Sequence, residues 1–273
     1  MLCDYHVHSL FSDDSNTPME QQAKQAVNLG LSELCFTDHV DYGVKFDHGD
    51  PRSVNRNENV NYPEYFPAIE EVREQFRGKL TIRAGLEFGV QSHTVREFED
   101  LFTKYRDKLD FVLLSIHQVE DKEFWTQDFQ QGKTQEEYNR EYYEEMLRVI
   151  RNYRDYSVLA HLDLIVRYDM KGVFPFAKVR DIVAEILTTA INDGKGIELN
   201  TSSWRYGLTD TQPCREILEL YRDLGGEILT LGSDAHSSDY VASHFEEGRE
   251  ILRSLGYRSF CTFERMTPTF HTL

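Results

Sequence analysis

The chain has 273 residues, of which 40% are hydrophobic and 28% are charged, and its formal net charge at pH 7 is −17. This length suits one large α/β domain, and we expect a single domain over residues 1–273 because no linker or change in composition divides the chain. The acidic balance argues against nucleic-acid or anionic-membrane partners, which bind basic surfaces. It leaves a small anionic substrate open, because metal ions and a few arginines can reverse the potential locally.

Targeting signals and cysteine usage predict a cytoplasmic protein. No apolar run approaches the roughly 18–20 residues of a membrane span. The first residues lack the basic and apolar regions of a signal peptide. The four cysteines are scattered and form no C-x-x-C pair, so we expect reduced thiols and neither a disulfide framework nor a zinc knot.

Short apolar runs alternate with amphipathic stretches along almost the whole chain. We expect strands at residues 3–8, 34–40, 80–88, 110–119, 157–164, 196–201 and 227–233. We expect helices at residues 19–28, 63–76, 94–105, 135–153, 176–192, 212–223 and 243–255. Glycines at 30, 78, 194 and 225 follow predicted helices, where helix ends favour glycine. Seven strand–helix repeats with continuously apolar strands predict a parallel sheet covered by helices.

The stretch "KFDHGDPRSVNRNENV" at residues 45–60 is polar and has no clear periodicity. It follows the second predicted strand, and in a barrel such a loop lies on the catalytic face. It is interpreted either as a lid that contacts substrate or as a solvated insertion without a role.

Histidines and carboxylates gather at the ends of the predicted strands. In "DYHVHS", His6 and His8 point to the same face of one strand, where two imidazoles can bind one cation. The other strand-end groups are His39, Glu87, His117, His161, Asp234 and His236. The carboxyl ends of parallel strands meet on one rim, which is where such folds hold their active sites.

The ligand chemistry favours a metal centre with several ions. Imidazole and carboxylate ligands without a cysteine cluster suit Zn²⁺, Mn²⁺ or Fe²⁺. More than six candidate ligands exceed what one ion can use while leaving room for substrate. A multinuclear centre follows, with Glu87 as a natural bridging carboxylate.

The motifs "DYHVHS", "FTDH", "GLE", "SIH", "AHLDL" and "GSDAH", in this order, resemble those of the PHP superfamily (polymerase and histidinol phosphatase). Within it, "HVHSLFSDDS", "AHLDLIVRY", "IELNTSSWRYG" and "GSDAHSSDYVASHF" are similar to the monofunctional histidinol-phosphatases, and the resemblance extends from residue 3 to about 263. The contexts of Arg167 and Arg205 point to this phosphatase branch. The resemblance implies a distorted (β/α)7 TIM-like barrel and three divalent metal ions.

Transferred residue by residue, the resemblance implies three ligand groups. The first group is His6, His8, Glu87 and Asp234, the second is Glu87, His117 and His161, and the third is Asp14, His39 and His236. Asp13 precedes Asp14 and is the alternative ligand of the third group. Asp38, Asp163, Asp4 and Ser233 are candidates for orienting ligands, with ordinary strand-end hydrogen bonding as the alternative interpretation.

The expected reaction is hydrolysis of a phosphate monoester, which the resemblance identifies as L-histidinol phosphate. A hydroxide that bridges the metals at Glu87 would attack phosphorus without forming a phospho-enzyme. We assign candidate catalytic roles to Glu87, His117, Asp234 and His236. Arg167 and Arg205 would bind the phosphate, and His244 is a weaker candidate for contact with the substrate.

Three other interpretations remain at this point. A phosphoesterase of the same superfamily would act on another small phosphate ester. An amidohydrolase barrel also begins with H-x-H, but it usually has a strand-four lysine and an eighth strand. A metal-binding module without activity would usually have lost ligands, whereas this chain keeps the complete set. The sequence leaves the native metal and the oligomeric state open.

Overall fold

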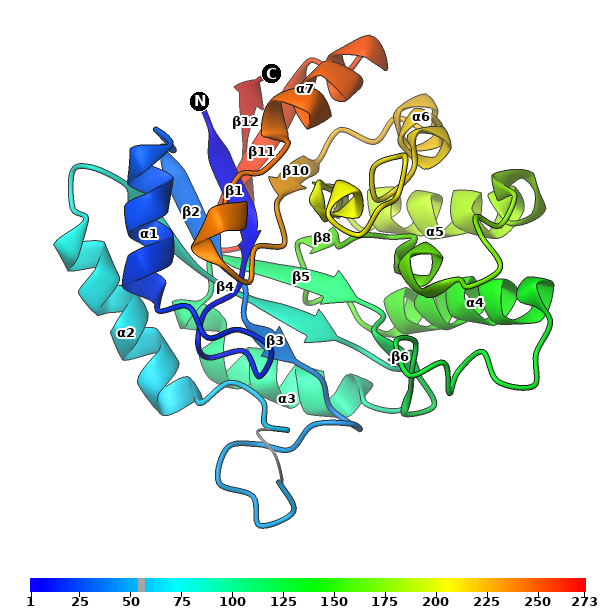
Figure 1. Cartoon of the computed structure of the whole chain (residues 1–273), viewed down its shortest axis with the longest axis horizontal. Helices are drawn as coiled ribbons and strands as arrows, with labels where there is room; N and C mark the ends of the chain where they lie inside the picture. The colour runs from blue at the N-terminus through cyan, green and yellow to red at the C-terminus, as the bar shows by residue number, and fades with distance from the viewer. Residues whose placement is uncertain (54–56) are drawn as a thin grey trace.

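The computed structural model describes residues 1–53 and 57–273, and it contains a curved sheet of parallel strands surrounded by helices (Figure 1). The strands pair in the order β1 (Cys3–Val7), β2 (Glu33–Phe36), β4 (Thr81–Gly89), β5 (Phe111–Ser115), β8 (Val158–Leu159), β9 (Gly196–Asn200) and β10 (Leu229–Gly232). The short β3 (His39–Val40) continues beyond β2 and pairs with the end of β4.

The two outer strands of this order meet, so the sheet closes into a barrel. Val7 forms a parallel bridge with Ala235, just after β10. The His8 amide donates to the Ala235 carbonyl at 2.9 Å, and the Ala235 amide donates to the His6 carbonyl at 3.2 Å. The predicted TIM-like barrel with seven strand–helix repeats is therefore confirmed.

One α-helix follows each barrel strand, and all seven lie close to the predicted ranges. They are α1 (Met19–Asn28), α2 (Tyr62–Gln75), α3 (Val95–Tyr105), α4 (Gln135–Asn152), α5 (Arg180–Asn192), α6 (Arg215–Asp223) and α7 (Phe245–Ser254). Helix α6 begins three residues later than predicted. Pro213 disfavours helical backbone at the residue before it, so the helix begins only after this proline.

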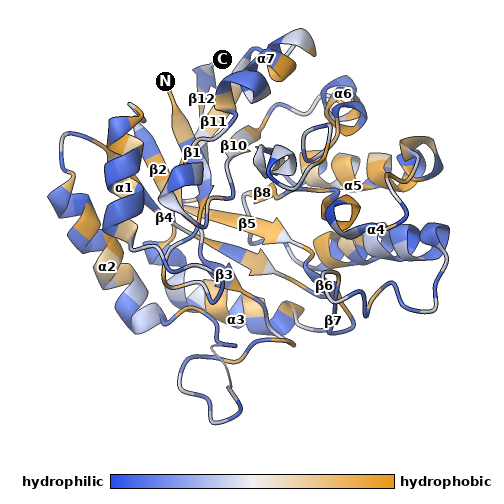
Figure 2. Cartoon of the chain, in the orientation of Figure 1, coloured by the Kyte–Doolittle hydropathy of each residue, from blue (hydrophilic) through white to orange (hydrophobic). Residues whose placement is uncertain are grey.

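The core lies between the strands and the inner faces of the helices. Strand residues such as Leu34, Leu86 and Leu113 are fully buried. Figure 2 shows the apolar strands at the centre, whereas the helices alternate between polar and apolar residues. This pattern is the expected result of parallel strands that are covered by amphipathic helices. Gly30 and Gly78, which follow α1 and α2, adopt positive φ angles of 77° and 76°, as expected at helix ends.

The chain ends in a β-hairpin, β11 (Ser259–Glu264) and β12 (Thr267–Thr272), which the sequence analysis did not assign. The Phe263 amide donates to the Tyr5 hydroxyl at 2.7 Å, which attaches the hairpin to β1. A second hairpin joins β6 (Gln118–Val119) and β7 (Lys122–Glu123). Short 3-10 helices complete the structure: η1 (Arg106–Lys108), η2 (Leu164–Tyr168), η3 (Phe176–Lys178), η4 (Ser202–Trp204) and η5 (Ser238–Tyr240). The fifth predicted strand is shorter than expected, because only Val158–Leu159 pair and η2 begins at Leu164.

Across residues 1–53 and 57–273, the structure has no helix with the length and apolar character needed to span a membrane.

Candidate metal centre

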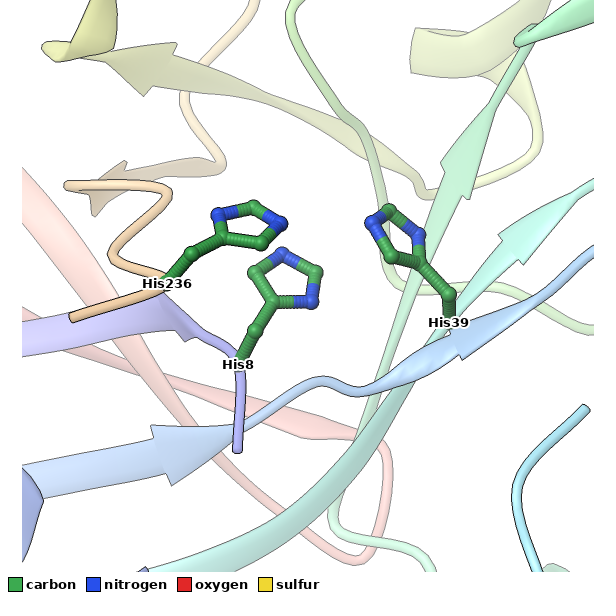
Figure 3. Close-up of side chains that lie close together, drawn as sticks. All are labelled: His8, His39 and His236. Atoms are coloured by element: carbon green, nitrogen blue, oxygen red, sulfur yellow. The ribbon is translucent and has the colours of Figure 1, made fainter. Parts of the chain in front are cut away.

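The histidines of the strand ends converge at the carboxyl end of the barrel. His8 follows β1, His39 begins β3, and His236 follows β10. Figure 3 shows their three imidazole rings turned toward a common space. One ring nitrogen from each lies within 4.8 Å of the others. Segments separated by some 200 residues of sequence therefore present ligand atoms at one point.

Glu87, near the end of β4, lies at the centre of the cluster and is fully buried. Its Oε2 atom lies 3.1 Å from His6 Nε2 and 3.4 Å from His8 Nε2. Its Oε1 atom lies 3.1 Å from His117 Nε2 and 2.9 Å from His161 Nε2. Oε2 also lies 3.1 Å from His39 Nδ1, so the two oxygens of one carboxylate face two different sets of histidines, which is the geometry of a bridging ligand.

Asp234 brings a second carboxylate to the first pair of histidines. Its Oδ1 atom lies 3.7 Å from His6 Nε2 and 3.5 Å from His8 Nε2. The first predicted ligand group is therefore together in space. His8 also belongs to the trio with His39 and His236, so its ring lies between the first group and the third.

The third predicted group assembles around Asp14. Its Oδ2 atom lies 3.5 Å from His39 Nε2 and 3.0 Å from His236 Nε2. The neighbouring Asp13 instead accepts a hydrogen bond from Lys45 Nζ at 2.6 Å. The contacts therefore favour Asp14 over Asp13 as the ligand.

Several buried ring nitrogens in this cluster are available for a metal ion. His8 Nε2, His39 Nδ1 and His236 Nε2 are inaccessible to solvent and make no hydrogen bond of good geometry in the part of the chain that the structure describes, although carboxylate oxygens of Glu87, Asp234 and Asp14 lie 3.0–3.5 Å from them. Leaving a buried polar atom unsatisfied costs about 1–3 kcal/mol, so such atoms usually mark a function or a missing ligand. These nitrogens, with the adjacent carboxylates, are a donor set that suits divalent zinc, manganese or iron.

The electrostatics of the cluster show a neutral imidazole at His8 and an excess of negative charge around His117. Burial and the neighbouring His236 and His39 rings lower the pKa of His8 well below its usual value, so its ring is neutral, as a ligand must be. Burial opposes ionisation of Glu87, but His6 and His39 outweigh it and hold the pKa of the carboxyl well below its usual range. Burial also opposes charging of His117, yet Asp41 and Glu87 raise its pKa to about 10. The carboxylates thus create a negative potential that cations would neutralise.

Three buried side chains contact the ring nitrogens of predicted ligands that point away from the centre. Glu198 Oε1 lies 2.7 Å from His6 Nδ1, Asp41 Oδ1 lies 2.7 Å from His117 Nδ1, and Ser12 Oγ lies 3.1 Å from His8 Nδ1. Each contact occupies the outer nitrogen of a ring and directs the other nitrogen into the centre. The sequence analysis did not identify these three residues. Glu198 carried a signal, because it is an acid within the apolar run "GIELN".

The four residues predicted to orient ligands make less direct contacts. Asp38 accepts a hydrogen bond from Ser12 Oγ at 2.9 Å and therefore acts on His8 only through that serine. Asp4 accepts hydrogen bonds from the Ser233 hydroxyl and from the amides of Ser233 and His6. Asp163 accepts a hydrogen bond from the Cys214 amide at 2.9 Å. Asp4, Ser233 and Asp163 thus fix the backbone near ligands, and they touch no imidazole ring among the described residues.

Two ligand residues have unusual backbone conformations. His161 has φ of 23° and Asp234 has φ of 54°, both in the left-handed region that non-glycine residues rarely adopt. Such conformations cost about 1–3 kcal/mol each and persist only where the surroundings impose them.

The cluster opens into a cleft of about 370 Å³, which we call the metal cleft. It is lined by ligands, by Asp13, Asp41, Lys45, Asn57, Glu123 and Leu164, by the aromatic residues Trp125, Tyr168 and Tyr206, and by Arg167. Arg167 is buried and faces Tyr206, with its guanidinium carbon 4.0 Å from the ring centre. Ser202 and Gln212 accept hydrogen bonds from its Nη2 atom at 2.7 and 2.9 Å. The cleft thus offers a fixed cation beside the candidate metal ligands.

The other two predicted substrate contacts lie differently. Arg205 donates a hydrogen bond from Nη2 to the Asp234 carbonyl at 2.7 Å, and its guanidinium packs over Tyr240. His244 precedes α7, its ring packs beside Trp204, and its Nδ1 atom lies 3.5 Å from Glu247. Neither residue is among the described residues that line the metal cleft. Their contact with substrate stays a prediction.

The polar stretch 45–60 contributes to the metal cleft at both ends. Lys45 Nζ lies 2.6 Å from Asp13 and 2.9 Å from Asp41, and Asn57 also lines the cleft. Residues 54–56 lie outside the described residues. The contacts of Lys45 and Asn57 favour a substrate-facing loop over an insertion without a role.

Comparison with known proteins places this arrangement in a family. The PHP domain model matches residues 4–202, about three quarters of the chain. The chain belongs to the PHP domain family. It is 32% identical to the histidinol-phosphatase of Lactococcus lactis, over 96% of this chain and 94% of that protein. It is 29% identical to the probable histidinol-phosphatase of Thermotoga maritima, over 94% of this chain and 93% of that protein.

A solved structure agrees with both the family and the fold. The histidinol phosphate phosphatase from Lactococcus lactis, in complex with zinc, L-histidinol and phosphate, superposes with a TM-score of 0.85 at 31% identity. The match covers 98% of each chain. The predicted resemblance to the PHP superfamily and to its histidinol-phosphatases is confirmed.

Proposed function

We propose that this protein hydrolyses L-histidinol phosphate to L-histidinol and phosphate, a step of histidine biosynthesis. The observation that carries the proposal is the convergence of three candidate ligand groups around Glu87, beside the buried guanidinium of Arg167. The similarity to histidinol-phosphatases over almost the whole chain supports the identity of the substrate.

The proposed centre holds three divalent ions in the three ligand groups. His6, His8, Glu87 and Asp234 form the first, Glu87, His117 and His161 the second, and Asp14, His39 and His236 the third. Zinc, manganese and iron(II) all suit these ligands, and the Lactococcus lactis relative was solved with zinc. When bound, such ions lower the pKa of a coordinated water and neutralise phosphoryl oxygens.

The chain's own residues then bind and orient the substrate. Arg167 would hold the phosphate, because its guanidinium is fixed by Gln212 and Ser202 and lines the metal cleft. Arg205 is the proposed second phosphate contact. His117 and His236 line the cleft as proposed ligands, so the proton for the departing alkoxide would come from a water in the cleft.

The test is phosphate release from L-histidinol phosphate, compared with p-nitrophenyl phosphate and a panel of small phosphate esters. The protein is purified without chelator and loaded with zinc or manganese. We expect a strong preference for L-histidinol phosphate, which a chelator abolishes. Good turnover of other esters with L-histidinol phosphate inert would overturn the substrate and keep the phosphatase chemistry. No release from any ester would overturn the enzyme itself and leave a metal-binding protein.

The role of Arg167 is tested by Arg167→Met, which keeps the length of the side chain and removes the charge. Losing a fixed cation at the developing charge should lower kcat/KM by about 10²–10³-fold. The metal content, measured by atomic spectroscopy, should stay unchanged. Arg215→Met, at an exposed arginine of α6, is the matched control and should leave kcat/KM unaltered. Loss of metal in the Arg167 variant would contradict a role limited to phosphate binding.

A further inference from the structure

A second cleft, of about 350 Å³, is lined by residues of α4 and α6 and of the segments that precede α5 and α6. Two chain segments form most of its wall, residues 163–179 and residues 208–217. The first segment contains Arg167, and the second begins three residues after Arg205. One segment of the wall therefore carries Arg167, and the other follows Arg205 in the chain.

The lining of this cleft combines apolar walls with acidic groups. The apolar walls are Val166, Val173, Phe174, Pro175, Phe176, Val179, Leu208 and Ile217. The acidic residues are Asp163, Asp210 and Glu216, and no lysine or arginine is among the described residues that line it. An apolar space whose charges are all negative is complementary to an organic cation with an apolar body.

Two of these acids have unused capacity to accept hydrogen bonds. Asp163 is 3% exposed, and its Oδ1 atom has no hydrogen-bond partner within residues 1–53 and 57–273, although its Oδ2 atom binds the Cys214 amide. Glu216 begins α6 and forms no ion pair with any described residue. Asp210, in contrast, already lies 3.2 Å from Arg215. An ammonium group would therefore find Asp163 and Glu216 free.

Gln212 connects the two clefts, because it lines the second cleft and accepts hydrogen bonds from Arg167, which lines the metal cleft. Its Oε1 atom accepts hydrogen bonds from Arg167 Nη2 at 2.9 Å and Nε at 3.2 Å. Its Nε2 atom is buried and has no partner in the described structure. A molecule that packs against Gln212 would restrain the residue that positions the guanidinium.

We propose that this second cleft, the amine cleft, binds a small organic ammonium with an apolar body, and that its occupancy fixes Gln212 and thereby Arg167. Preorganising a phosphate-binding side chain lowers the cost of binding the phosphate. Occupancy should therefore lower KM and leave kcat nearly unchanged. The expected effect on KM rests on the proposed phosphatase function, whereas binding of the ammonium compound does not.

Binding is tested on the zinc-loaded full chain by methyl NMR, with benzylamine as the probe and benzyl alcohol as its uncharged counterpart. The methyl signals of Val173 and Leu208 report on the amine cleft, and those of Leu164, which lines the metal cleft, serve as the control. We expect benzylamine to shift the first two in a saturable way and to bind about threefold more tightly than the alcohol, as expected for a partly exposed ion pair.

Variants on α6 give a matched comparison. Glu216→Gln should weaken benzylamine about threefold, whereas Glu219→Gln, at an exposed acid of the same helix outside the cleft, should not. Equal affinity for benzylamine and benzyl alcohol, or shifts confined to Leu164, would overturn the site.

The coupling is tested by the steady-state kinetics of p-nitrophenyl phosphate hydrolysis with benzylamine present. We expect KM to fall about twofold in the parent protein and in Glu219→Gln, and less in Glu216→Gln. A benzylamine-independent KM, in a protein whose Val173 and Leu208 signals do shift, would overturn the coupling and keep the site. If the protein released no phosphate at all, the proposed function would fail, while the NMR result would still decide the site.

Discussion

The buried carboxylate of Asp110, at the amino end of the barrel, and the buried imidazoles at its carboxyl end differ in how their hydrogen bonds are satisfied. At the amino end, Asp110 accepts hydrogen bonds from Arg73 Nη2 at 2.7 Å and from the Ala84 amide at 3.0 Å, and Tyr5 is bonded to Glu33 and to the C-terminal hairpin. At the carboxyl end, His8 Nε2 and His236 Nε2 are inaccessible to solvent and lie 3.0–3.5 Å from carboxylate oxygens, yet they make no hydrogen bond of good geometry in the described part of the chain. Satisfied groups stabilise a fold, whereas unsatisfied ones mark where a ligand is needed. The amino end is therefore expected to govern stability and the carboxyl end to govern activity.

The largest expected effect is at the carboxyl end, in Glu87→Ala. Removing the carboxylate that faces five histidines should lower kcat by about 10³-fold or more and reduce the bound metal. Activity and metal content are measured on the same preparation, with circular dichroism to show that the barrel is retained. Glu97→Ala, at an exposed acid of α3, is the control. Full activity in the Glu87 variant would refute the proposed ligand map.

Asp41→Asn tests a residue of the carboxyl end that is expected to act on the metal centre only through its contact with His117. The substitution keeps the shape of the side chain and removes the charge that holds His117 Nδ1. Metal affinity should fall about 10–100-fold, as found when groups behind metal ligands are changed. Competition with a chelator measures the affinity, and Asp47→Asn, an exposed acid of the same connection, should leave it unchanged. Unaltered metal affinity would show that Asp41 does not position His117.

The smallest effect on activity is expected at the amino end, in Asp110→Ala. The loss of its hydrogen bonds should lower the free energy of unfolding by about 2 kcal/mol. Urea unfolding of the metal-loaded protein measures this, and kcat should stay within about twofold of the parent value. Asp107→Ala, an exposed acid of η1, is the control for stability. A large loss of activity in the Asp110 variant would contradict the assignment of stability to the amino end and of activity to the carboxyl end.

The sequence was most informative where chemistry and periodicity coincide. The barrel could be predicted because each strand is continuously apolar and each helix amphipathic, and the ligands because imidazoles and carboxylates recur at strand ends. Glu198 and Asp41 could not be assigned in the same way, since their roles depend on which ring nitrogen they face, and this is set by side-chain packing across the barrel. The C-terminal hairpin escaped prediction because its attachment to Tyr5 spans 258 residues of sequence.

The left-handed backbone at His161 and Asp234 has an evolutionary consequence. Glycine adopts these angles without strain, so replacing either residue by glycine would relieve local strain at the expense of a metal ligand. A copy of this gene released from selection for activity would therefore relieve backbone strain by losing its ligands at these two positions. Glycine at the positions of residues 161 and 234 would accordingly mark descendants that have kept the barrel and lost the metal-dependent activity.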